Sequence, residues 1–394
     1  MRKRSFVPLL FSIVPLFLTG CWDRTELNDV AFKIGLAMDL TEDGLYEASA
    51  QFAVPSQLGG SKGSPGGSEG EAYFVEKGIG KDTREAIQNM QTRISRRVHA
   101  GQRRAIFIGE SLARKKGIAT VIDTNARDPQ TRLRTDIFLV KGGQAKDILD
   151  ISYPFERVPV LATVKMHRMV GGSRTTEYRD FLMREFDDVS FPTMPVLQIN
   201  RDEDGRKKQF RVEGRAIFDK DLKLIGFLNA EQSRYHLWII GPINRQVITI
   251  SNPDGGGNLS LNLTKMGRKI DPVIQGNKVK IYITLTGKGE ILENGTNVEL
   301  YKSENLKKIE AALNQDVEKK GLSTIGMVQK QFGTDIFDFG RAIHRKYPYQ
   351  WRTLRNDWHH VFADTEVIVR SKLNVQRIGR TGGFLELNVG DNEK

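Results

Sequence analysis

The segment RAIFIGESLA, residues 104–113, decides the fold class. Its first half, Arg104–Ile108, is a short apolar run typical of a buried strand, and a helix is predicted to follow at Glu110–Ala126. A helix with Asp82 as its N-cap, Asp82–Val98, precedes the segment, and a further strand, Arg134–Lys141, comes after it. Strands that alternate with helices in this way favour an α/β or α+β sheet layered with helices.

Upstream of this region the pattern is that of strands followed by a linker. Asp29–Leu40 and Tyr46–Val54 are predicted strands. Residues 55–70 then contain six Gly and four Ser, a composition typical of a flexible linker. We therefore predict a mixed α+β fold in several domains, with mixed sheets packed against helices.

Two stretches rich in turn residues indicate domain boundaries. Predicted helices at 156–169 and 175–186 lead into a charged turn at 202–205, and a Gly-rich loop lies at 252–257. Three strands are predicted between them, at 209–218, 222–228 and 245–251. The predicted organisation is an N-terminal α/β domain at 21–200, a middle β-rich domain at 201–257 and a C-terminal α+β domain at 258–394.

The C-terminal domain is predicted to be a sheet packed with several helices. A strand is expected at Val279–Leu285, and then a helix that begins at Ser303 and ends before Gly321. The remaining predicted elements are a helix with Ile325, Val328 and Phe332 on one face, a helix that ends at Pro348, a helix with Trp351, Leu354 and Trp358 on one face, and strands at Val361–Val369 and Lys372–Ile378.

The first 20 residues have the layout of a secretory signal peptide. Arg2, Lys3 and Arg4 precede an apolar run at 6–18, which is shorter than the roughly 20 residues that a bilayer-spanning helix needs. Leu18-Thr19-Gly20-Cys21 then resembles the lipobox of bacterial lipoproteins, in which diacylglycerol is attached to the cysteine sulfur before cleavage. We expect a signal peptide at 1–20 and lipidation at Cys21, since no later stretch approaches a membrane span.

Cys21 is the single cysteine of the chain, so no intramolecular disulfide is possible. A free thiol would be a liability in an oxidising compartment, and a thioether to lipid removes it. Diacylglycerol and a further acyl chain on Cys21 would suffice for stable anchoring, since a single chain gives only marginal binding. The mature body of about 370 residues would then be tethered to a membrane by its N-terminus.

Positive charge is concentrated in one part of the chain. Residues 81–134 hold 13 Lys and Arg against 5 Asp and Glu. Arg96, Arg97, Arg103 and Arg104 are its densest part, and they form a possible interaction patch for anionic headgroups or an acidic partner. The alternative is a solvated face with scattered counterions. No nucleic-acid-binding motif occurs.

No motif of a known catalytic or cofactor site is present in the sequence. A G-x-S-x-G elbow and a P-loop are both missing. His359 and His360, near His344 and Asp357, are a weak candidate for a metal site, because the side chains of adjacent residues point to different faces. Asp335 and Asp338 are expected to cap or solvate a helix start. We therefore predict no catalytic, metal or cofactor-binding residue, and no enzyme.

Several blocks resemble the Ger(x)C family, the C subunits of spore germinant receptors. They are GCWDRTELND at 20–29, AIFIGESLA at 105–113 with RDP at 127–129, GRAIF at 214–218 with LIGFL at 224–228, and DIFDFGRAIHRKYP at 335–348 followed by Trp351. The last block is the strongest match. Many members carry Gly-His where this chain has Gly101-Gln102, so a role for that histidine does not transfer.

The resemblance implies a function in spore germination. It implies a lipoprotein on the outer face of the inner spore membrane that assembles with two integral membrane subunits, A and B, and takes part in the response to nutrient germinants without catalysis. It also implies a mixed α/β architecture of three domains. The alternative is a solute-binding lipoprotein that captures a small nutrient directly, which would need a concave, largely apolar pocket.

Overall fold

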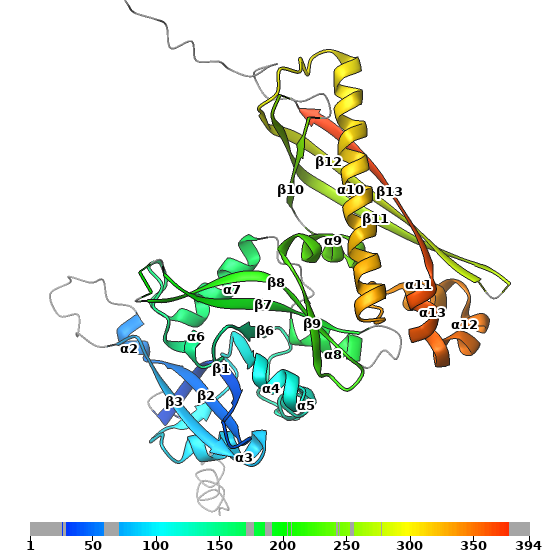
Figure 1. The fold of residues 1–394 in the computed structure, drawn as a ribbon. Coiled ribbons are helices and arrows are strands. Elements are labelled where there is room, and N and C mark those ends of the chain that lie inside the picture. Colours follow the sequence, from blue (N-terminus) through cyan, green and yellow to red (C-terminus); the bar gives the residue numbers. More distant parts are fainter. Residues whose placement is uncertain are drawn as a thin grey trace, which may run out of the picture.

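The computed structural model shows two β-sheets, each packed with helices (Figure 1), which confirms the predicted α+β class. It describes residues 26, 29–58, 71–170, 177–185, 191–202, 204–205, 207–241, 243, 245–252, 256–276 and 278–377. The predicted signal peptide, Cys21 and most of the predicted linker at 55–70 lie outside these residues. The first four linker residues form a short helix, α2 (Pro55–Leu58).

The first sheet combines a parallel centre with antiparallel flanks. Its order is β3-β2-β1-β5-β6-β7-β8-β9, and the short β4 also pairs with β1. The strands are β1 (Val30–Leu40), β2 (Tyr46–Ala53), β3 (Tyr73–Gly80), β4 (Arg97–His99), β5 (Ala105–Gly109), β6 (Asp136–Lys141), β7 (Thr193–Arg201), β8 (Lys208–Phe218) and β9 (Leu224–Leu228). Neighbours β1, β5, β6 and β7 are parallel. Every residue of β5 is buried, which explains its unbroken apolar run.

Helices cover both faces of this sheet and form a core on each. One face packs against α3 (Thr83–Gln91), α4 (Glu110–Lys115), α5 (Ala119–Ala126) and α8 (Tyr178–Glu185), and the other against α6 (Asp147–Asp150) and α7 (Pro159–Met169). Ile106 and Ile108 of β5 belong to the first core, whereas Ala105 and Phe107 belong to the second. The alternation follows from the period of two residues along a strand.

The second sheet has the order β10-β11-β12-β13 and packs against a long helix. Its strands are β10 (Gln246–Ser251), β11 (Asn258–Gln275), β12 (Lys278–Asn294) and β13 (Glu366–Arg377); its helices are α9 (Ala230–Ile240), α10 (Ser303–Gln331), α11 (Phe339–Lys346), α12 (Pro348–Leu354), the 3-10 turn η4 (Arg355–Asp357) and α13 (Trp358–Asp364). Figure 1 shows α10 lying along the sheet, with α11, α12 and α13 clustered beside one end of it. None of the described helices is long and apolar enough to cross a bilayer.

Residues 201–257, predicted as a middle domain, are divided between the two sheets. Strands β8 and β9 continue the first sheet through antiparallel pairing with β7, whereas β10 pairs with β11 in the second. The predicted boundary near 200 therefore falls within the β7–β8 hairpin. Long-range pairing decides this division, and the local turn residues that suggested the boundary mark only the hairpin loop.

Several predicted elements have different bounds in the structure. The helix predicted at Asp82–Val98 ends at Gln91, and Arg97–His99 form β4. The helix expected to end at Gly321 continues as α10, because Gly321 does not adopt the positive φ with which a glycine ends a helix. The helix predicted at 110–126 is divided into α4 and α5 at Gly117, which has φ +73°. Residues 361–364, predicted as strand, end helix α13 instead because Phe362 packs in the same core as Trp358.

Helix α9 was not predicted, although it has a local signal. The Asn229 side chain accepts a hydrogen bond from the Gln232 N–H, and the Gln232 side chain accepts one from the Asn229 N–H, which together form a capping box. The helix is buried around most of its circumference, so its sequence lacks a polar face. A search for the capping pair would have found it.

Gly226 of β9 tests the packing between the two parts of the molecule. A Cβ at this position would lie 2.2 Å from Cε1 of Phe332, just past the end of α10. We expect Gly226→Ala to lower the free energy of unfolding by about 1–3 kcal/mol, since the ring or the strand must shift. Urea denaturation followed by circular dichroism measures the change.

The control is Gly326→Ala within α10, where a Cβ would meet nothing within 4 Å. This substitution should raise the free energy of unfolding by up to about 1 kcal/mol, because alanine favours helix over glycine. If Gly226→Ala were as stable as the original chain, the described contact between β9 and Phe332 would be incorrect.

Candidate functional site

The four arginines singled out from the sequence do not share one surface. Arg96, Arg97 and Arg104 are exposed, but Arg103 is only 2% exposed. Its Nη2 donates to Thr131 Oγ1 at 2.9 Å, in the loop before β6. The structure therefore removes Arg103 from the predicted patch, because adjacent residues entering β5 point in opposite directions.

Arg103 and Lys33 of β1 place positive charge inside the protein. Lys33 is 3% exposed, and burial lowers its pKa to about 7, with a further lowering by the positive charge of Arg103. Burial also lowers the pKa of Arg103 to about 10, and the Asp128 carboxylate acts in the opposite direction on both groups. Arg103 Nε and Nη1 have no hydrogen-bond partner among the described residues. Lys33 and Arg103 are therefore buried cations, unlike the exposed Arg96, Arg97 and Arg104.

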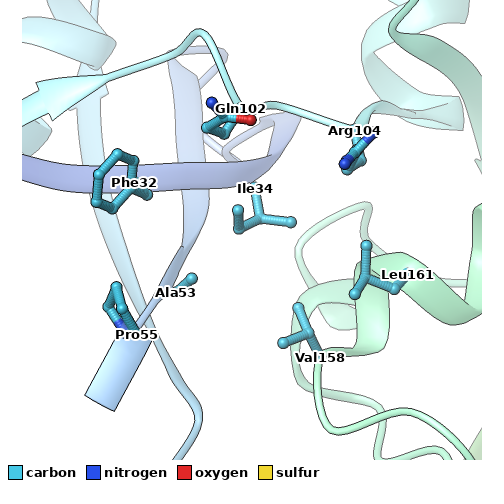
Figure 2. Close-up of a pocket in the computed structure, with 8 residues that line it drawn as sticks. All are labelled: Phe32, Ile34, Ala53, Pro55, Gln102, Arg104, Val158 and Leu161. Carbon is cyan, nitrogen blue, oxygen red and sulfur yellow. The ribbon is translucent and has the colours of Figure 1, made fainter. Parts of the chain in front are cut away.

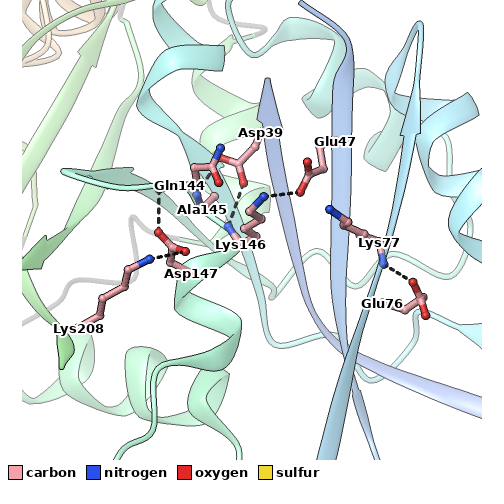
Figure 3. Close-up of polar contacts among 9 residues, drawn as sticks. All are labelled: Asp39, Glu47, Glu76, Lys77, Gln144, Ala145, Lys146, Asp147 and Lys208. Atoms are coloured by element: carbon pink, nitrogen blue, oxygen red, sulfur yellow. Dashed lines mark hydrogen bonds and ion pairs between the residues drawn. The ribbon is translucent and has the colours of Figure 1, made fainter. Parts of the chain in front are cut away.

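A network of paired charges occupies the carboxyl ends of the parallel strands (Figure 3). Asp39, near the end of β1, accepts hydrogen bonds from the backbone N–H groups of Ala145 and Lys146 at 2.8 and 2.9 Å. Lys146 Nζ in turn lies 2.9 Å from Glu47 Oε1. Burial raises the pKa of Asp39 to about 6. Because these groups are partnered within the protein, the network holds the loop before α6 in place.

A small pocket lies between the start of β1 and the start of α7 (Figure 2). It has a volume of about 240 Å³ and is lined by Phe32, Ile34, Ala53, Pro55, Gln102, Arg104, Val158 and Leu161. Apart from Gln102 and Arg104, these residues are apolar. Pockets for drug-sized ligands usually measure about 300–1,000 Å³, so this one has room only for a small solute.

The block DIFDFGRAIHRKYP begins with a buried aspartate that organises the surrounding chain. The Asp335 carboxylate accepts hydrogen bonds from the backbone N–H groups of Phe337, Phe339 and Gly340, at 2.9, 3.3 and 2.8 Å, and from the indole N–H of Trp358 at 3.1 Å. Since α11 begins at Phe339, Asp335 satisfies N–H groups that a helix start leaves without partners. The expectation that Asp335 serves a helix start is confirmed.

The same block joins the two halves of the molecule. The N–H of Phe191, just before β7, donates to the backbone carbonyl of Asp335 at 3.1 Å. His236 of α9 donates from Nε2 to the carbonyl of Ile336 at 3.0 Å, since a carbonyl can only accept. Phe337 packs within the core of the second sheet, which also includes Leu228 of the first sheet. The most recognisable block of the sequence is thus a structural junction.

The other candidate residues of this region do not form a common site. Asp338 has φ +64° and makes no side-chain cap to α11. The exposed His344 ring stacks on Trp351, with ring centroids 6.2 Å apart, whereas His359 and His360 lie on α13. Within the described part of the chain, no group of three or more His, Cys, Asp or Glu side chains could hold a metal ion.

Removal of the Asp335 charge tests the junction. We expect Asp335→Asn to lower the free energy of unfolding at pH 7 by about 2 kcal/mol, because an amide presents one acceptor oxygen to four donors and leaves buried N–H groups unpaired. Thermal or urea unfolding measures the loss. Asp357→Asn, an exposed position on η4, is the control and should change stability by less than about 0.5 kcal/mol. Equal effects of the two substitutions would contradict the structural role.

The contribution of Asp335 to stability should depend on pH. Burial raises the pKa of Asp335 from 3.8 to about 6, so between these values the folded state keeps a proton that the unfolded state releases. Its contribution to stability is complete below pH 3.8 and is lost as the pH rises through about 6. The stability difference between the original chain and Asp335→Asn should therefore be larger at pH 4.5 than at pH 7. A difference that grew with pH would contradict this assignment.

Comparison with known proteins matches nearly the whole described chain to one family. Residues 23–199 match the family model "Spore germination protein N-terminal domain", and residues 213–379 match "Spore germination B3/ GerAC like, C-terminal". The two models meet at the β7–β8 turn. The crystal structure of the GerBC protein has the same fold, with a TM-score of 0.55 and 19% sequence identity over 87% of this chain and 97% of that chain.

Known spore germination proteins match this chain over almost their full length. The putative spore germination protein YfkR of Bacillus subtilis (strain 168) is 30% identical over 382 residues, which cover 96% of this chain and 98% of that protein. Spore germination protein KC of the same organism is 25% identical, over 96% of this chain and 97% of its own length. Both family models, the relatives and the fold agree. The chain therefore belongs to the Ger(x)C family of spore germination proteins.

Proposed function

We propose that this protein is the lipid-anchored, non-catalytic C subunit of a spore germinant receptor. It would act with the integral membrane A and B subunits on the outer face of the inner spore membrane. The observation that carries the proposal is the match along almost the whole chain to germination proteins. The N-terminal family model starts at residue 23, two residues after Cys21, so the match begins where a cleaved and lipidated chain would begin.

The anchor supplies the physical basis of this role. Two acyl chains on Cys21 would keep the body at the membrane, because each buried methylene contributes about 0.8 kcal/mol. Confinement beside the membrane subunits raises their effective concentration, so a weak interface can remain occupied. Tethering thus replaces some of the affinity that a freely diffusing subunit would need.

The buried carboxylates support a structural role over a catalytic one. A raised pKa in a cleft is a common mark of a catalytic group. Asp39 and Asp335 have raised pKa values, but both accept hydrogen bonds from several backbone N–H groups within packed cores. Their partners are the chain itself, so they hold loops and helix starts in place.

The lipidation site provides the test of this proposal. We expect Cys21→Ala spores to contain an uncleaved or released protein and to lose most of their response to nutrient germinants, because the sulfur that carries the lipid is missing. Fractionation of spore membranes and loss of optical density on nutrient addition measure both effects. Thr19→Ala keeps a small residue before the cysteine and should behave as the original chain. Full germination with a demonstrably soluble Cys21→Ala protein would refute the tethering role.

The alternative, direct capture of a nutrient, is supported by the apolar pocket beside β1. Calorimetry with residues 22–394 and the germinant distinguishes the two functions. Heat of binding that disappears on Ile34→Trp, which fills the pocket, would favour the solute-binding function. Absence of binding, together with retained co-purification of the membrane subunits, would favour the subunit role.

A further inference from the structure

One edge of the first sheet receives the chain from the predicted anchor. Strands β1, β4, β5 and β6 are linked by parallel pairing, so their amino ends face the same edge. Strand β1 starts at Val30, nine residues after Cys21. An extended chain spans at most about 3.5 Å per residue, so Val30 lies within about 30 Å of the lipid attachment point. An anchored protein would therefore hold this edge beside the bilayer.

This edge carries a group of exposed arginines. They are Arg96, Arg97, Arg104, Arg132 and Arg134, and we call them the basic edge. Backbone and side-chain contacts bring their loops together: Arg97 pairs with Val30, the Ala100 N–H donates to Gln130 Oε1 at 3.0 Å, and the Asp136 N–H donates to the carbonyl of Arg104 at 3.0 Å. Arg132 and Arg134 belong to the basic segment of the sequence, but only the structure brings their loop against the residues that follow β4, at Ala100 and Arg103.

The basic edge differs from the rest of the sheet in lacking ion pairs. None of its five guanidinium groups forms one with a carboxylate of the described residues. At the carboxyl ends of the strands, by contrast, Lys146 is paired with Glu47, and Lys208 Nζ lies 2.8 Å from Asp147 Oδ1 (Figure 3). Three described carboxylates near Leu133, those of Asp136, Glu177 and Asp180, form ion pairs with Arg168 and Arg179 and not with the arginines of the basic edge. The edge is therefore a site of uncompensated positive charge.

An exposed apolar side chain lies within the same group. Leu133, between Arg132 and Arg134, is 51% exposed. Its backbone is held, because its carbonyl accepts a hydrogen bond from the Arg179 N–H at 2.9 Å. Amphipathic helices that lie in the membrane interface also combine Leu with Lys and Arg.

We propose that the basic edge docks on anionic phospholipid headgroups of the membrane that carries the anchor, with Leu133 entering the headgroup layer. The proposal rests on the proposed function, since the tether brings this edge to the bilayer. Attraction between basic side chains and an anionic surface acts within about 10 Å, a distance that such docking achieves. The sheet would then stand with its amino-end edge on the membrane and its paired, carboxyl-end edge facing away.

Vesicle binding by residues 22–394 tests the proposal without the lipid. This chain retains every described residue, and it lacks Cys21, so neither the anchor nor the receptor contributes to the result. We expect co-sedimentation with vesicles of phosphatidylcholine and phosphatidylglycerol, but not with phosphatidylcholine alone, and weakening of the binding as salt is raised. The quadruple variant Arg96→Gln, Arg97→Gln, Arg132→Gln, Arg134→Gln should bind about 100-fold or more weakly, at about fivefold per arginine.

A matched variant separates the location of the charge from its amount. Lys307, Lys308, Lys319 and Lys330 are exposed on α10, and none forms an ion pair with a described residue. Changing these four to Gln removes the same net charge and should change vesicle binding by about twofold at most. Circular dichroism checks that both variants are folded. If the quadruple arginine variant is not, the pair Arg132→Gln, Arg134→Gln, which lies in a loop, should still weaken binding about 25-fold.

Three results would overturn the proposal. They are equal loss of binding in the arginine and lysine variants, binding that does not depend on phosphatidylglycerol, and unchanged binding by the arginine variant. Absence of vesicle binding, combined with loss of receptor subunits from pull-downs of the arginine variant, would also overturn it and would assign the edge to an acidic protein surface. None of these results bears on whether Cys21→Ala spores germinate, so the two proposals fail separately.

Discussion

The buried carboxylate of Asp335 is the interaction on which the arrangement of the two halves depends. A charge inside a core is tolerated only where donors surround it, and four N–H groups from the start of α11 and from Trp358 do so. The same residue accepts a hydrogen bond from Phe191 at its backbone carbonyl. One short block thus orders the helical cluster of the second half and attaches it to the first sheet.

This junction has a consequence for a tethered protein. The first sheet receives the chain from the predicted anchor at β1, while the second sheet and α10 join it farther along the strand order, beside β7 and β9 (Figure 1). Because the two halves share a core, an orientation imposed on the first sheet passes to the second. A membrane-bound subunit built in this way would present the second half to its partners in a defined direction. Uncompensated arginines at one edge and paired charges at the other are consistent with such an orientation.

The local sequence pattern was sufficient to predict some helices and strands but not others. The strands at 104–108 and 134–141 were predicted within two residues because buried parallel strands are short, unbroken apolar runs. Gly321 misled the prediction for α10, since a glycine that ends a helix and one within a helix look the same in sequence. Helix α9 was missed because a buried helix lacks the polar face on which periodicity depends.

The sequence by itself determined the class of the fold, the family and the residues worth testing, because these follow from apolar periodicity, composition and short motifs. Only the tertiary structure decided that Arg103 is buried while Arg104 is exposed, that the loop of Arg132 and Arg134 packs against Ala100 and Arg103, and that residues 201–257 are shared between two sheets. The physical reason is that burial and pairing depend on partners distant in the chain, such as Asp335 with Trp358 or His236 with Ile336. Such partners meet only when the cores pack.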